Sequence, residues 1–153
     1  MTAAPLDPHD DIAVAFNRLL EAWAHGFAAR LSAEVPYDLG DTEYRIISLF
    51  ARADVLGPSE LAARIGIGLP SISKALAKLR TKGLVTTSRD PHDGRALLVH
   101  PTEEGRRVAL ALRRAGADMA RTLVADWDAA DVEDLRRLII GFAEATEKLA
   151  RKL

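Results

Sequence analysis

Hydrophobic residues recur every three or four positions near the start of the chain. This spacing predicts a long amphipathic helix that begins at Asp7 and ends before Pro36. Asp7 is placed as its N-cap, with Pro8 at the first helical position. The apolar stripe consists of Ile12, Phe16, Leu19, Trp23, Phe27 and Leu31.

Three shorter helices are predicted next, separated by glycine-containing breaks. The first follows Asp41, the second covers about 58–65 with Gly66 as its C-terminal cap, and the third covers 69–81 and closes at Gly83. The third helix has a basic and serine-rich face opposite a set of apolar positions. Those apolar positions are Ile72, Ala75, Leu76 and Leu79.

The periodicity changes after Gly83 from helical to strand-like. Residues 84–88 and 95–100 have the β-branched character of strands, and the turn-forming residues 90–94 lie between them. We therefore expect a β-hairpin with a protruding polar tip.

Two long helices complete the pattern. Thr102 is the expected cap of the first, which ends at Trp127, and Asp128 with Asp131 starts the second, which continues to the C-terminus. Four helices, a hairpin and two helices in this order predict a mainly α fold, a winged helix-turn-helix with a two-stranded β-wing. The apolar stripes of the long terminal helices would be buried most simply against a second copy of the chain.

These elements divide the chain by expected role. We predict one domain over 1–153, in which 7–35 and 103–153 are dimerisation helices and 41–101 is the winged helix-turn-helix region that binds DNA. A length of 153 residues fits one domain, and 48% hydrophobic with only 5% aromatic residues favours closely packed helices.

Several classes of protein are disfavoured by what the sequence lacks. There is no cysteine, which excludes disulfides, thiolate metal sites and thiol redox sensing. We see no paired histidine spacing, nucleophile elbow, HExxH motif or P-loop, so we expect no metal, no cofactor and no enzyme. The acidic N-terminus and the absence of a long apolar run make the cytoplasm the expected location, without membrane contact.

Charge is distributed unevenly along the chain. The formal net charge is -1, yet residues 60–95 hold seven basic and three acidic residues. A basic middle with acidic arms is expected when one segment faces a polyanion, although a solvated surface of mixed charge explains it equally well. Charge alone does not decide between the two.

Candidate DNA-binding residues lie on the helix over 69–81 and on the hairpin. A helix in the major groove needs short polar residues near its N-terminus and basic residues further along, and the arginines of a narrow hairpin suit a minor groove. The candidates are Pro70, Ser71, Ser73, Lys74 and Lys78 on the helix and Arg89, Asp93 and Arg95 on the hairpin.

The stretch from residue 59 to residue 105 resembles the core of the MarR family of bacterial regulators. It contains in order ELA, a glycine turn, a helix end of the pattern SxxLxxLxxKGLV, a DPxDGR wing and TEEG. The resemblance implies a dimeric winged-helix repressor on a pseudo-palindromic operator of double-stranded DNA, released by a small phenolic or lipophilic ligand. It also implies that Asp93 and Arg95 form the wing pair, with Arg95 in the minor groove.

Three positions depart from the family's pattern. Gly68 stands where a serine often caps the recognition helix, so this cap is expected to be weaker by a few tenths of a kcal/mol. Thr87 and Gly94 stand where arginines are common, which removes phosphate contacts for which Arg89 would compensate. We therefore expect weaker DNA binding with a shallower salt dependence.

The resemblance also implies an effector crevice between the dimerisation helices and the DNA-binding region. Its candidate lining is Trp23, Phe27, Tyr37, Tyr44 and Arg45. Aromatic residues on helical stripes are more often simply core residues, and that interpretation stays open. An alternative for the whole chain is a helical protein-interaction module that has lost DNA binding; such a module has no reason to keep Lys74, Lys78 and Arg95 on one side.

Overall fold

The computed structural model describes residues 7–22, 26, 28–91, 93, 96–150 and 152. The chain divides into two compact units, Met1–Gly116 and Ala117–Leu153. In chain order, the elements are α1 (Pro8–Ala22), α2 (Ala28–Ser32), α3 (Asp41–Leu49), α4 (Pro58–Ile65), α5 (Leu69–Thr81), β1 (Val85–Arg89), β2 (Leu97–Pro101), α6 (Glu103–Leu123) and α7 (Ala129–Ala150). The predicted order of elements is confirmed, apart from one interrupted helix.

The prediction of one continuous helix from Asp7 to Pro36 is wrong. The structure has two helices here, because α1 ends at Ala22 and α2 begins at Ala28. Between them Gly26 has φ +142°, which lies outside the range of a regular α-helix and which glycine tolerates best. In the sequence the hydrophobic stripe continues across this break. The spacing of apolar residues alone therefore does not reveal where the helical backbone is interrupted.

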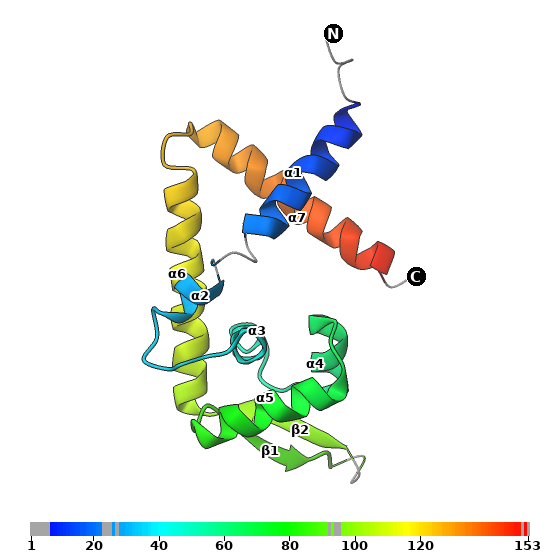
Figure 1. Ribbon diagram of the computed structural model, residues 1–153, viewed down its shortest axis with the longest axis vertical. Helices are drawn as coiled ribbons and strands as arrows, with labels where there is room; N and C mark the ends of the chain where they lie inside the picture. Colours follow the sequence, from blue (N-terminus) through cyan, green and yellow to red (C-terminus); the bar gives the residue numbers. More distant parts are fainter. Residues whose placement is uncertain are drawn as a thin grey trace. The chain divides into compact units, whose positions relative to one another are not determined.

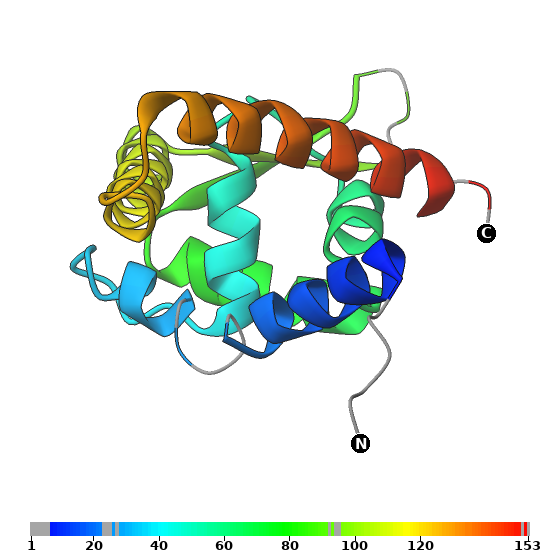
Figure 2. The same ribbon diagram turned by 90° about the horizontal axis from the view of Figure 1, so that it is seen from above.

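The core of the first unit is formed by α3, α4, α5, the two strands and the first half of α6. Figures 1 and 2 both place α3 between α4 and α6, with α5 beside the hairpin in Figure 1. The largest fully buried side chains are Phe50, Ile46, Ile47, Leu61, Ile72, Leu79, Leu84 and Val99. These residues come from five different segments, so one apolar core holds α3, α4, α5 and the hairpin together as a unit.

The hairpin is antiparallel, and its register pairs Val85 with Pro101 and Arg89 with Leu97. A third segment joins it, because Leu56 exchanges both backbone hydrogen bonds with Val99, with N···O distances of 3.1 and 2.9 Å. Leu84 and Val99 are fully buried at the root of the hairpin. The predicted two-stranded wing is confirmed and is attached to the loop before α4.

Residues at the helix ends match several sequence predictions. Gly66 ends α4 in the left-handed region at φ +75°, and the Oδ1 atom of Asp7 accepts from the His9 backbone N–H at 2.9 Å. Thr102 caps α6 by accepting from the Gly105 N–H at 3.0 Å. The predicted end of that helix at Trp127 is late, because regular helix stops at Leu123 and turns lead to Asp128.

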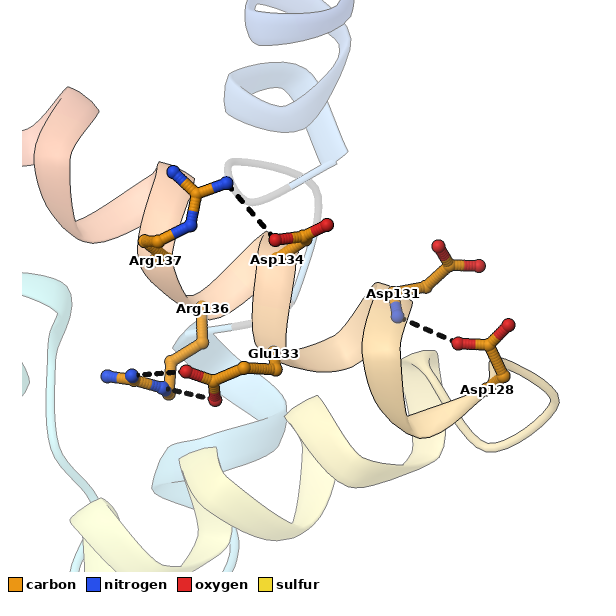
Figure 3. Close-up of polar contacts among 6 residues, drawn as sticks. All are labelled: Asp128, Asp131, Glu133, Asp134, Arg136 and Arg137. Carbon is orange, nitrogen blue, oxygen red and sulfur yellow. Dashed lines mark hydrogen bonds and ion pairs between the residues drawn. The ribbon is translucent and has the colours of Figure 1, made fainter.

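The second unit contains α7 and its capping residues. Asp128 accepts from the Asp131 N–H at 2.8 Å, as expected for an N-cap (Figure 3). One helical turn further, Arg136 forms a bidentate pair with Glu133, and Arg137 pairs with Asp134 at 3.1 Å. These exposed pairs stabilise the helix locally by a few tenths of a kcal/mol each.

Candidate nucleic-acid interface

Helix α5 has one buried and one exposed face. Ile72 and Leu79 are completely buried, and Ala75 and Leu76 lie beside them in the core. Every candidate on the other side is exposed, namely Pro70, Ser71, Ser73, Lys74 and Lys78. The apolar stripe therefore orients the helix, and this orientation presents the serines and lysines to solvent.

The N-terminal half of α5 is the more open part of this face. Lys74 has no hydrogen-bond or ion-pair partner among the residues that the structure describes. Gly68 takes the N-cap position with an extended backbone and makes no side-chain cap bond, as the sequence predicts. A short polar surface with one unpaired cation therefore surrounds the start of the helix.

The C-terminal half of α5 is held by an acidic residue of α3. Glu43 is only 3% exposed, and its two carboxylate oxygens face two lysines of α5. Lys78 Nζ lies 3.3 Å from Oε1, and Lys82 Nζ donates to Oε2 and to the backbone carbonyl of Asp38. Lys78, a predicted DNA contact, thus also has an intramolecular partner.

The Glu43 carboxyl is held in its charged form. Burial by itself raises the pKa of Glu43, but the hydrogen bonds and positive charges of Lys82 and Lys78 outweigh it, so the pKa lies below its ordinary value. A buried carboxylate without such partners would be strongly unfavourable. The pairing therefore joins α3 and α5 by charge as well as by apolar packing.

Sequence reasoning missed this cluster, although a signal was present. Glu43 precedes Ile46, Ile47 and Phe50 by three, four and seven residues, which puts a charged residue on the buried face of α3. A charged residue at a core position calls for an opposite charge nearby. What the pattern could not identify was which of the many lysines and arginines supplied it.

The hairpin presents part of the predicted wing site. Arg89 is exposed at the end of β1, and Asp93 is exposed in the connection. The backbone at the tip is closed by a bond from the Asp90 N–H to the Ala96 carbonyl at 3.0 Å and from the Ala96 N–H to the Asp93 carbonyl at 2.9 Å. Arg95 lies outside the described residues.

The candidate effector residues have contacts within the first unit. The Tyr37 hydroxyl donates to Glu104 Oε1 at 2.8 Å, and Arg45 donates to the Ile65 carbonyl at 2.7 Å at the end of α4. Burial raises the pKa of the Tyr44 hydroxyl, with a further contribution from Asp41. Trp23 and Phe27 lie outside the described residues.

The described part of the chain shows neither a metal-binding cluster nor a membrane-spanning helix. No group of three or more His, Asp or Glu side chains there is arranged to hold a metal ion. None of the helices combines the length and the apolar character that a bilayer crossing requires.

Comparison with known proteins shows a similarity to one family over the middle of the chain. Residues 37–96 match the family model of the MarR family. The curated relative YdgJ of Bacillus subtilis (strain 168), an uncharacterised HTH-type transcriptional regulator, is 26% identical over 102 residues. That alignment covers 67% of this chain and 60% of YdgJ, so the chain spans less than two thirds of that relative's length.

Solved structures are similar over nearly the whole chain. Streptococcus pneumoniae FabT in complex with DNA has a TM-score of 0.68 and 18% identity, over 92% of this chain and 96% of FabT. The PcaV transcriptional regulator of Streptomyces coelicolor, in complex with its natural ligand, has a TM-score of 0.62 and 26% identity, over 94% of this chain and 99% of PcaV. Members of the matched family are transcriptional regulators and not enzymes, in agreement with the prediction from sequence. The chain, with its two-faced α5 and its attached wing, has the winged-helix fold of MarR-family transcriptional regulators, and its residues 37–96 are similar to that family.

Proposed function

We propose that this protein binds double-stranded DNA sequence-specifically and regulates transcription as a repressor. The observation that carries the proposal is the exposed face of α5 near the start of the helix, which the core holds in place. Ser71, Ser73 and Lys74 lie there, and Lys74 has no partner among the described residues. A recognition helix meets base edges with this part of its surface. The DNA complex of FabT, which has the same fold, supports this placement.

The wing completes the proposed contact surface. Arg89 at the end of β1 and Arg95, which precedes β2 in the sequence, would enter a minor groove, where negative potential attracts arginine. Asp93 would hold Arg95 in one geometry by a charge-assisted hydrogen bond. Lys78 and the Pro70 end of α5 would lie along the major groove.

The acting form in this proposal is a cytoplasmic homodimer on a pseudo-palindromic operator. Large apolar side chains of α1 and α7 are exposed in the single chain, and a second copy would cover them. Two recognition helices about 34–36 Å apart would then enter successive major grooves.

We further propose that a small phenolic or lipophilic ligand releases the protein from DNA. The ligand complex of PcaV supports this, and Tyr37, Tyr44 and Arg45, with Trp23 and Phe27, are the candidate contacts. Such a ligand acts only if it binds the form with wrongly spaced recognition helices more tightly than the DNA-binding form. Titrating phenols against the protein–DNA complex, with spin labels on α5 reporting helix spacing, tests this; unchanged binding and spacing would exclude it.

The first experiment measures fluorescence anisotropy of the full chain against duplexes tiled upstream of its own gene, at several salt concentrations. We expect saturable binding to one tile, at two protomers per duplex and tighter than to other tiles by about 10³ or more. Weak binding that is equal for all tiles and disappears at high salt would show that the protein binds DNA only non-specifically, through its charges. No binding to any tile would favour a protein-interaction module instead.

Lys74→Ala is expected to weaken binding to that tile by about 1–3 kcal/mol, because it removes a cation at the reading end of α5. Arg137→Ala is the matched control. Arg137 is paired with Asp134 on α7, and its loss should leave affinity almost unchanged. Equal losses in both variants, measured by the same anisotropy titration, would show that α5 is not the DNA-contacting helix.

A further inference from the structure

The three lysines on one side of α5 differ in their surroundings. Lys74 has no partner among the described residues, whereas Lys78 and Lys82 both reach the buried carboxylate of Glu43. The Lys78 side chain is 57% exposed, and the Lys82 side chain is 27% exposed and also bound to the Asp38 carbonyl. Cations at equal helical spacing therefore have unequal access to solvent.

The charges of this cluster leave one net positive charge. Two ammonium groups share one carboxylate, which is almost completely buried. A charge pair with limited solvent access is screened by salt much less than an exposed pair. One of the two lysine charges is therefore neutralised within the protein.

We propose that Glu43 is a specificity-determining positioning residue that withholds one lysine charge of α5 from DNA. Non-specific affinity comes almost entirely from cations that meet phosphates, whereas specific affinity also includes contacts with base edges. An internal carboxylate beside the proposed recognition helix therefore lowers the non-specific affinity for DNA more than the specific affinity. The inference rests on the proposed DNA binding and deepens it.

The test compares the salt dependence of DNA binding in the wild type and Glu43→Gln, on the preferred tile and on an unrelated duplex. Gln keeps the shape of the side chain and removes its charge, so one more lysine becomes available to phosphate. We expect the slope of log affinity against log salt to steepen by about 0.9 per protomer. The ratio of specific to non-specific affinity should fall.

Glu133→Gln is the control for net charge alone. It also removes a carboxylate and releases an arginine, but on α7, and should leave the slope unchanged. The double variant Glu43→Gln with Lys82→Met restores the net charge of the cluster and should return the slope to the wild-type value. A purely structural role of Glu43 would leave the slope unchanged in every one of these variants.

Thermal unfolding of each variant gives its unfolding transition, and binding is measured at temperatures below that transition. If Glu43→Gln does not fold, Lys82→Met alone decides the question, because Glu43 would then pair with Lys78 only and the slope should become shallower by about 0.9 per protomer. An unchanged slope in whichever variant folds overturns the inference while leaving DNA binding intact. Absence of wild-type binding to any duplex overturns the proposed function and this inference together.

Discussion

At the scale of single residues, the tightest backbone approach lies where α6 begins beside the hairpin. A Cβ built on Gly105 would lie 1.8 Å from the Leu84 carbonyl oxygen and 2.8 Å from its carbon. Both are backbone atoms of a fully buried residue, so neither moves easily. Only glycine lets the first turn of α6 pack this closely on the root of the wing.

Gly105→Ala is therefore expected to lower the free energy of unfolding by about 1–3 kcal/mol, as overpacking does in a closed core. Gly116→Ala is the matched control in the same helix, because no atom of the described residues lies within 4 Å of its Cβ position. That substitution should raise stability by about 0.5–1 kcal/mol through helix propensity. Urea denaturation measures both, and changes of the same sign would contradict the close packing at Gly105.

At the scale of elements, the wing, α5 and α6 meet at Thr102. Its Oγ1 accepts from the Gly105 N–H at 3.0 Å and donates to the Gly83 carbonyl at 2.7 Å, while its own N–H donates to the Leu84 carbonyl at 3.0 Å. One residue therefore caps α6 and also satisfies backbone groups in the turn after α5. This fixes the start of α6 against the turn that connects α5 to the wing.

Thr102→Val should cost about 0.5–2 kcal/mol of stability, because it removes the cap and leaves the two backbone groups without a side-chain partner. Thr122→Val is its control, since the Thr122 hydroxyl only bonds back to the Asp118 carbonyl one turn earlier on the exposed surface. Thermal unfolding of the pair measures the difference. Equal shifts would mean that the Thr102 bonds contribute nothing beyond helix propensity.

The parts of the fold that could be predicted are those encoded by neighbouring residues. Gly66, Thr102 and Asp128 end or start their helices as expected, because turn and cap chemistry is local. The break at Gly26 was missed because glycine is tolerated within helices and the apolar stripe did not change there. The Glu43 cluster was missed because its members are more than thirty residues apart, and spacing cannot identify long-range partners.

At the scale of the whole molecule, the long helices keep apolar surface that the single chain does not bury. On α7 no described residue is buried, and Leu138 and Ile139 are 59% and 52% exposed. On α1 Leu19 and Phe16 are likewise exposed. Isolated apolar residues on a surface are ordinary, but an apolar stripe along a whole helix is the kind of surface that the proposed second copy would cover.

Ile139→Arg is expected to shift the protein from dimer to monomer, because a charge in the centre of an apolar interface is poorly solvated. Sedimentation velocity over a range of concentrations measures the shift. Arg137→Ala, two residues away and already ion-paired with Asp134, should leave the association state unchanged. A wild-type protein that is monomeric at high concentration would remove the basis of the homodimer.

The double hydrogen bond between Leu56 and Val99 has a mechanical consequence. A hairpin of two five-residue strands is marginal by itself, and this bond makes its root part of the body that also holds the start of α4. Displacement of the hairpin would therefore be passed through Val99 and Leu56 to the loop before Pro58. If the wing binds DNA as proposed, a change in the shape of the bound duplex at the wing would reach the start of α4 through these backbone bonds.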